Sequence, residues 1–197
     1  ASNNTAIGTD SLSANTTGAQ NVSVGYQALS ANTTAADNTA VGYQALLANT
    51  TATNNTGIGA GALRSTSTGG SNTAVGVASQ YASTGSNNSS LGVNTFRYNT
   101  SGSNNTAVGF EALKLNTTAA DNVAVGYKAL VSNTTGSENT SVGSFSMNLN
   151  TTGLYNSAFG RLALRVNTTG IQNTALGYQA MAANTTANNN TAVGYNA

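Results

Sequence analysis

The chain has 197 residues, of which only 6% are charged, and a net charge of +1, whereas typical soluble domains carry about 25% charged residues. This balance excludes the basic surface with which a nucleic-acid-binding protein neutralises phosphates and the polybasic patch of a protein that binds acidic membranes, and no apolar run approaches the ~18 residues of a membrane span. Cys and His are absent, which removes disulfides, thiolate ligands and the commonest general base, so we expect no cofactor.

A five-residue motif, Asn-Thr-Ala-Val-Gly or a close variant, recurs along the whole chain. Its copies begin at Asn4, Asn21, Asn38, Asn55, Asn72, Asn88, Asn105, Asn122, Asn139, Asn156, Asn173 and Asn190. Every step is 17 residues except the one from Asn72 to Asn88, which is 16. A short fixed period is typical of a solenoid with one coil per repeat. We therefore predict an all-β fold, a β-solenoid or parallel β-roll of about 11–12 coils, in one domain spanning 1–197.

The first half of each repeat, with this Asn as position 1, predicts a short strand. Position 4 is always apolar and mostly β-branched, as strands favour, while position 3 is always Ala, Ser or Gly. Alternate side chains of a strand point to opposite faces, so we predict that position 4 builds the core and that position 3 faces a close neighbour, either another wall of the same coil or another chain. The predicted core ladder is Ile7, Val24, Val41, Ile58, Val75, Leu91, Val108, Val125, Val142, Phe159, Leu176 and Val193.

Position 5 is Gly in every copy of the repeat. We expect a positive φ or a close backbone approach there, where the strand turns. These turn glycines are Gly8, Gly25, Gly42, Gly59, Gly76, Gly92, Gly109, Gly126, Gly143, Gly160, Gly177 and Gly194.

The second half of the repeat commonly reads Tyr-Gln-Ala-Leu, two variable residues and Asn-Thr-Thr-Gly. Four residues cannot form a stable helix alone, so Tyr-Gln-Ala-Leu predicts a second short strand or a corner. The large apolar residue at position 9 joins the core; the exception is Gln80, whose place we expect Tyr81 to fill. Asn-Thr-Thr is typical of a turn in which Asn side chains bond nearby backbone.

One repeat cannot fold alone. Two buried side chains at about 1.5–3 kcal/mol each do not offset about 1–2 kcal/mol of backbone entropy per residue. Hydrogen bonds between stacked coils and ladders of identical side chains supply the remainder, giving a rod of about 55 Å at about 4.8 Å per coil. Because this core is slender, we expect several chains to associate around a common axis.

The repeats at Asn38–Asn54, Asn122–Glu138 and Asn173–Asn189 are similar to those of phage-type tail-fibre-domain proteins and bacterial surface proteins. They also resemble the head repeats of trimeric autotransporter adhesins. The resemblance covers essentially the whole chain and implies a left-handed, trimeric β-roll in a shaft or head. The period is longer than in the best-known adhesin heads, and the chain holds no stalk, anchor or chaperone domain; we read it as a segment of a longer fibre or a processed protein.

The Asn-Thr-Thr triplets also match the N-glycosylation signal of secreted proteins. The candidate acceptors are Asn15, Asn32, Asn49, Asn116, Asn133, Asn150, Asn167 and Asn184. Thr-rich turns are, in addition, a composition that accepts O-linked sugars. The competing interpretation is that Asn and Thr serve only turns and ladders.

Other chemistry is sparse. The carboxylates are Asp10, Asp37, Glu111, Asp121 and Glu138. Asp121 and Glu138 lie one coil apart, but a calcium cage needs more oxygen ligands, and solvated turn residues are the simpler interpretation. The aromatic row at position 6 could bind sugars, stabilise a ladder or cover an interface. Arg161 and Arg165 share one coil and could contact a glycan or an acidic surface.

These features favour an extracellular fibrous protein on a cell surface, in a secreted matrix or on a virion, acting by rigid extension and display and contacting a host surface or glycan receptor. Its partner would be further copies of itself, in a trimer or an end-to-end filament. The alternatives are a self-assembling, glycosylated filament, motivated by the incomplete repeats at both ends, and an ice-binding solenoid with Thr ladders. No convergent set of titratable groups indicates an enzyme.

Overall fold

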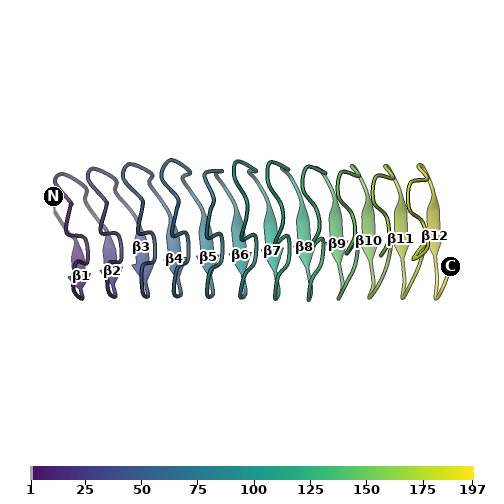
Figure 1. Ribbon diagram of the computed structural model, residues 1–197, viewed down its shortest axis with the longest axis horizontal. Helices are drawn as coiled ribbons and strands as arrows, with labels where there is room; N and C mark the ends of the chain where they lie inside the picture. Colours follow the sequence, from purple (N-terminus) through teal and green to yellow (C-terminus); the bar gives the residue numbers. More distant parts are fainter. Residues whose placement is uncertain (1) are drawn as a thin grey trace.

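The computed structural model, which describes residues 2–197, is a straight stack of coils (Figure 1). Each coil contributes one three-residue strand. The strands are β1 (Thr5–Ile7), β2 (Val22–Val24), β3 (Thr39–Val41), β4 (Thr56–Ile58), β5 (Thr73–Val75), β6 (Ser89–Leu91), β7 (Thr106–Val108), β8 (Val123–Val125), β9 (Thr140–Val142), β10 (Ser157–Phe159), β11 (Thr174–Leu176) and β12 (Thr191–Val193). They form one parallel sheet in chain order, which confirms the predicted all-β solenoid.

Neighbouring strands pair so that each repeat position stacks on the same position of the next coil. Thr106, for example, pairs with Val123. The 16-residue repeat keeps this register, since Thr73 pairs with Ser89. Its missing residue falls in the Asn-Thr-Thr turn, where the N–H of Thr84 still donates to the carbonyl of Thr100 at 2.9 Å. The shorter repeat is therefore absorbed outside the sheet.

The Tyr-Gln-Ala-Leu segment forms a corner, and no second strand is present in residues 2–197. Extended structure is interrupted because the residues at positions 7 and 9 have positive φ, as at Gln44 (53°) and Leu46 (52°). Their N–H groups nevertheless bond to both neighbouring coils: Gln44 donates to Tyr26 O at 2.9 Å and Leu46 to Ala62 O at 3.0 Å. Of the two expected alternatives, the corner is the one observed.

The predicted core ladder at position 4 is wrong, because these side chains point outward. None of them is buried: Ile7, Val24, Val41, Ile58, Val75, Leu91, Val108, Val125, Val142, Phe159, Leu176 and Val193 are all exposed or half-exposed. The interior is lined by position 3 and, from the opposite wall, by positions 8 and 9, as in Ala124, Ala129 and Leu130. This space is too narrow for a β-branched residue, so the bulk lies on the outer face and position 3 faces another wall of the same coil.

Two neighbouring substitutions test this arrangement. Val125→Thr keeps the β-branched shape on a partly exposed face and is expected to change the free energy of unfolding by less than about 0.5 kcal/mol. Ala124→Val adds two methyl groups to a fully buried site and is expected to cost about 1–3 kcal/mol through overpacking. Urea denaturation of both variants checks the prediction; a larger loss for Val125→Thr would contradict the outward direction of position 4.

The twelve turn glycines all have φ between 122° and 135°. At Gly109 an added Cβ would lie 2.5 Å from the carbonyl oxygen of Gly126 in the next coil. Positive φ and close approach, the two features expected of this row, therefore occur together there.

The apolar interior divides into two clusters along the stack. One cluster includes Leu29, Leu46 and Leu63, and the other begins at Phe96. Between them Gln80 occupies the buried position 9 itself, with no exposed surface, whereas Tyr81 lies outside the core and is partly exposed. The expectation that Tyr81 fills the place of Gln80 is wrong, because the backbone register is kept through this coil.

Candidate functional site

Buried Asn side chains form a continuous ladder at position 1. Each Oδ1 accepts the backbone N–H of the Asn in the next coil, as from Asn139 to Asn122 at 3.0 Å. The Nδ2 groups also bond within the protein. That of Asn122 donates to Asn105 Oδ1 at 3.2 Å and to the carbonyl of Ala120 at 3.1 Å. The side chains replace water for the backbone at the start of every strand, which removes the cost of burying its polar groups.

A second ladder contains the predicted glycan acceptors at position 12. Asn32, Asn49, Asn116, Asn133, Asn150 and Asn167 are fully buried, and Asn15 and Asn184, in outer coils, are half-buried. The Nδ2 that a glycan would modify is occupied; in Asn133 it donates to Asn116 Oδ1 at 3.0 Å and to Gly136 O at 2.8 Å. The prediction of these residues as glycan acceptors is therefore wrong for the buried members of the folded chain, because a sugar on Nδ2 would break both bonds and have no space.

The neighbouring Thr row at position 13 is also engaged. Thr100 Oγ1 donates to the carbonyl of Thr117, and Thr117 Oγ1 to that of Thr134, each at 2.9 Å. These hydroxyls reinforce the stacking of coils. Ice binding by the turn Thr ladder stays a prediction, and it would have to use hydroxyls whose hydrogens already point at the protein.

The aromatic row at position 6 lies on the outer surface. Tyr26 and Tyr43 are stacked with ring centroids 5.6 Å apart, and Tyr178 and Tyr195 are stacked at 5.1 Å. All but Tyr178 are more than two-fifths exposed. The row is interrupted by Ala60, which opens the surface next to Tyr43.

Ionic contacts in residues 2–197 centre on Glu111. Lys114 Nζ lies 2.6 Å from one of its carboxylate oxygens and Lys128 Nζ 3.6 Å from the other. The hydrogen bond from Lys114, supported by the charge of Lys128, holds the pKa of Glu111 below its usual value, although desolvation opposes the shift. Within the described residues no three Asp or Glu side chains gather where they could hold a metal ion, so a calcium cage at Asp121 and Glu138 has no support.

A polar layer separates the two apolar clusters. Ser79 Oγ lies 2.6 Å from Ser90 Oγ and 2.8 Å from Thr95 Oγ1, and Gln80 Nε2 donates to Ser90 Oγ at 2.9 Å. Gln80 Oε1, however, is buried without a hydrogen-bond partner. An unpaired buried acceptor destabilises the fold, and the ladder of large apolar residues is broken at the same point.

Gln80→Leu is expected to raise the free energy of unfolding by about 1–2 kcal/mol. The variant removes the unpaired Oε1 and joins the two apolar clusters, and the positive φ of 48° is the one Leu29 adopts at the same repeat position. Chemical denaturation of the purified chain measures the change. The matched control is Leu113→Gln, which introduces the same polar group between apolar neighbours and should destabilise; a stability loss in Gln80→Leu would show that the polar layer is favourable.

The surface beside this irregular coil carries a shallow hollow. It has a volume of about 330 Å³ and is lined by Tyr43, Gln44, Ala60, Gly61, Arg64, Val77, Ala78 and Tyr81. It exists because positions 6 and 7 carry small residues in two successive coils, namely Ala60-Gly61 and Val77-Ala78. The sequence signals were present, in the small residues at positions 6 and 7 of these two coils, but the resulting hollow was not predicted.

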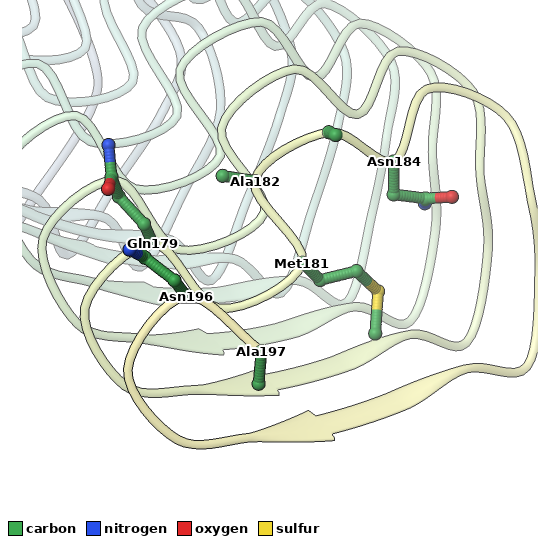
Figure 2. A pocket seen from close by; sticks show the side chains of 7 residues that line it. Gln179, Met181, Ala182, Asn184, Asn196 and Ala197 are labelled. Atoms are coloured by element: carbon green, nitrogen blue, oxygen red, sulfur yellow. The ribbon is translucent and has the colours of Figure 1, made fainter.

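A second hollow lies at the last coil (Figure 2). Its lining includes Met181, Asn184 and Ala197. Residues 190–197 cover only the strand side of the preceding coil, so the side chain of Met181 is reached from the end of the stack. We attribute this hollow to the edge of the described coils rather than to a built site.

Comparison of the chain with protein-family models, curated proteins and solved structures finds no match. No helix in residues 2–197 is long and apolar enough to cross a membrane. The interpretation of function therefore depends on the geometry above.

Proposed function

We propose that the protein is an extracellular, structural fibrous protein that acts as a rigid rod, as in the shaft or head of a surface adhesin or tail fibre. The observation that carries the proposal is the unbroken parallel pairing of all twelve strands, continued through the Asn ladders. Almost every residue of the repeat serves stacking, which gives length and stiffness and leaves few side chains for chemistry. The role is one of extension and display rather than catalysis.

We propose further that the partner is a second copy of the chain, bound through the outer row at position 4. Leu91 and Leu176 are 53% and 49% exposed, and no charged residue occurs at positions 2 to 4 in any repeat. The face is twelve strands long, at a spacing of about 4.8 Å, and three residues wide, at a rise of about 3.3 Å per residue. Its area is therefore about 550 Å² per partner, or about 1,100 Å² for both partners. This total reaches the ~1,000 Å² of buried surface expected of a specific interface. An identical ladder also matches the spacing of this face.

Electron microscopy and analytical ultracentrifugation of the purified chain test both proposals. We expect rods about 55 Å long for one set of aligned chains, or longer filaments in multiples of that length, and a mass that is a multiple of 19.6 kDa. A compact particle would overturn the fibrous role. Leu91→Lys combined with Leu176→Lys should yield folded single chains, whereas Thr34→Lys with Thr118→Lys, on the exposed turn, should leave the assembly intact; assembly that survives the Leu variants would overturn the proposed interface.

A further inference from the structure

The hollow beside Gly61 is a place where the outer surface of the solenoid departs from its repeat. Gly61 is the one Gly at position 7; all the other coils carry a side chain there. An added Cβ at Gly61 would already contact the ring of Tyr81 at 3.3 Å. The volume of about 330 Å³ lies at the lower end of the range for small-molecule sites. Tyr43, which is 55% exposed, presents its ring at one side. The hollow therefore combines a small concave surface with an accessible aromatic face.

Arg64 also lines this hollow, and its guanidinium is held by two hydrogen bonds. Its Nε donates to Gln44 Oε1 at 2.9 Å, and its Nη1 donates to the hydroxyl of Tyr81. The guanidinium carbon also lies 5.4 Å from the centroid of the Tyr81 ring, a favourable cation–π distance. These contacts use two of five N–H donors, so three remain in a group that is already oriented.

The charge around this group is unbalanced. Arg97 lies over the same Tyr81 ring at 5.6 Å, and its Nε is buried without a hydrogen-bond partner. Within residues 2–197, ion pairs form only at Glu111, so neither Arg64 nor Arg97 has a carboxylate within 4.0 Å. Two cations that share one aromatic ring and have no counter-charge favour an anionic ligand.

We propose that this hollow binds an acidic saccharide, a sugar unit that carries a carboxylate. The carboxylate accepts two parallel hydrogen bonds from Arg64, the geometry for which a guanidinium is suited. The C–H face of the sugar ring lies against the negative face of the Tyr43 ring. Gln44 Nε2 donates one hydrogen to Gln27 Oε1 at 2.9 Å and keeps the other for a sugar hydroxyl. The proposal is independent of the structural role, since a rod can exist without this site.

Calorimetric titration of the full chain with a galacturonic-acid trisaccharide, and with the neutral galactose trisaccharide of the same linkage, tests the proposal. Wild type is expected to bind the acidic probe at least tenfold more tightly than the neutral one. Gly61→Gln restores the commonest residue of position 7 and fills the hollow, so it should abolish binding while the chain stays folded, with only a small change in the unfolding temperature from the 3.3 Å contact of the added Cβ with the Tyr81 ring. Arg64→Met should lower affinity for the acidic probe at least tenfold, and Arg165→Met, at the same repeat position in another coil, should have no effect.

Three results would overturn the proposal. The first is no heat of binding at about 10 mM acidic probe, which places any dissociation constant above the millimolar range. The second is equal affinity for the acidic and neutral probes. The third is binding that persists in folded Gly61→Gln, which would put the contact elsewhere on the rod.

Discussion

Gly109→Ala is expected to lower the free energy of unfolding by about 3–5 kcal/mol, among the largest effects of any single substitution in this chain. Gly109 has φ of 125°, a region essentially restricted to Gly, and the added Cβ would lie 2.5 Å from the carbonyl oxygen and 2.8 Å from the carbonyl carbon of Gly126. Neither atom can move without separating β7 from β8. Urea unfolding followed by circular dichroism measures the loss.

The control for this variant is Gly194→Ala. Gly194 has φ of 135°, but the nearest atom to its added Cβ is Ala197 Cβ at 3.7 Å. It therefore experiences only the backbone strain, about 1–3 kcal/mol, in a coil at the end of the stack. Equal losses at the two positions would show that φ, and not the contact between coils, determines the requirement for Gly.

The sequence predicted the period, the parallel stacking and the turn glycines because each depends on spacing alone. A residue that returns every 17 positions must stack on itself once the coils are in register. The same logic could not decide which side of the strand faces inward. Val125 and Ala124 are both compatible with a buried row until the distance to the opposite wall is known, and that distance depends on the positive φ values of the corner, as at Lys128 and Leu130.

The Asn row at position 12 was assigned to a turn because Asn is a common turn residue, and the row at position 1 was treated only as the start of the strand motif. Their burial had a signal in the sequence: an amide that returns at a fixed position can donate to and accept from its own copies about 4.8 Å away. Where the Asn row at position 12 is interrupted, a buried polar atom is left without a hydrogen bond. Asn49 Oδ1 has no partner, because the next coil carries Thr66 at that position. The hollow at Gly61 was not predicted although its small residues stand in the sequence, because its shape depends on which outer rows become neighbours at the corner.

Asn122→Asp should show how strongly the interior depends on the amide donor. At pH 7 we expect a loss of at least about 3 kcal/mol, because a buried carboxylate would face Asn105 Oδ1 and the carbonyl of Ala120 in place of Nδ2. The substitution is isosteric, so packing is preserved and Oδ1 can still accept the N–H of Asn139. The loss therefore reports on charge and donor capacity rather than on a cavity.

The sign of the pH dependence follows from the direction of the pKa shift. Burial and the facing oxygens favour the protonated carboxyl and raise the pKa of this Asp in the folded chain above its value of about 3.9 in the unfolded chain. The variant is thus closest to wild type below pH ~4, where the acid is protonated in both states and its O–H replaces one amide donor. Stability relative to wild type then falls by up to about 1.4 kcal/mol per pH unit as pH rises toward the folded-state pKa.

Urea unfolding of wild type and variant between pH 3 and 8 measures this difference at each pH. The control is Asn104→Asp, an exposed residue at position 17, where Asp37 and Asp121 occur naturally. That variant should stay within about 0.5 kcal/mol of wild type throughout. A pH-independent loss in Asn122→Asp would mean that water reaches the Asn ladder, which would then be a solvated row and not part of a dry interior. A loss that grows with pH in Asn122→Asp alone would establish that coil stacking depends on a dry, neutral row of amides.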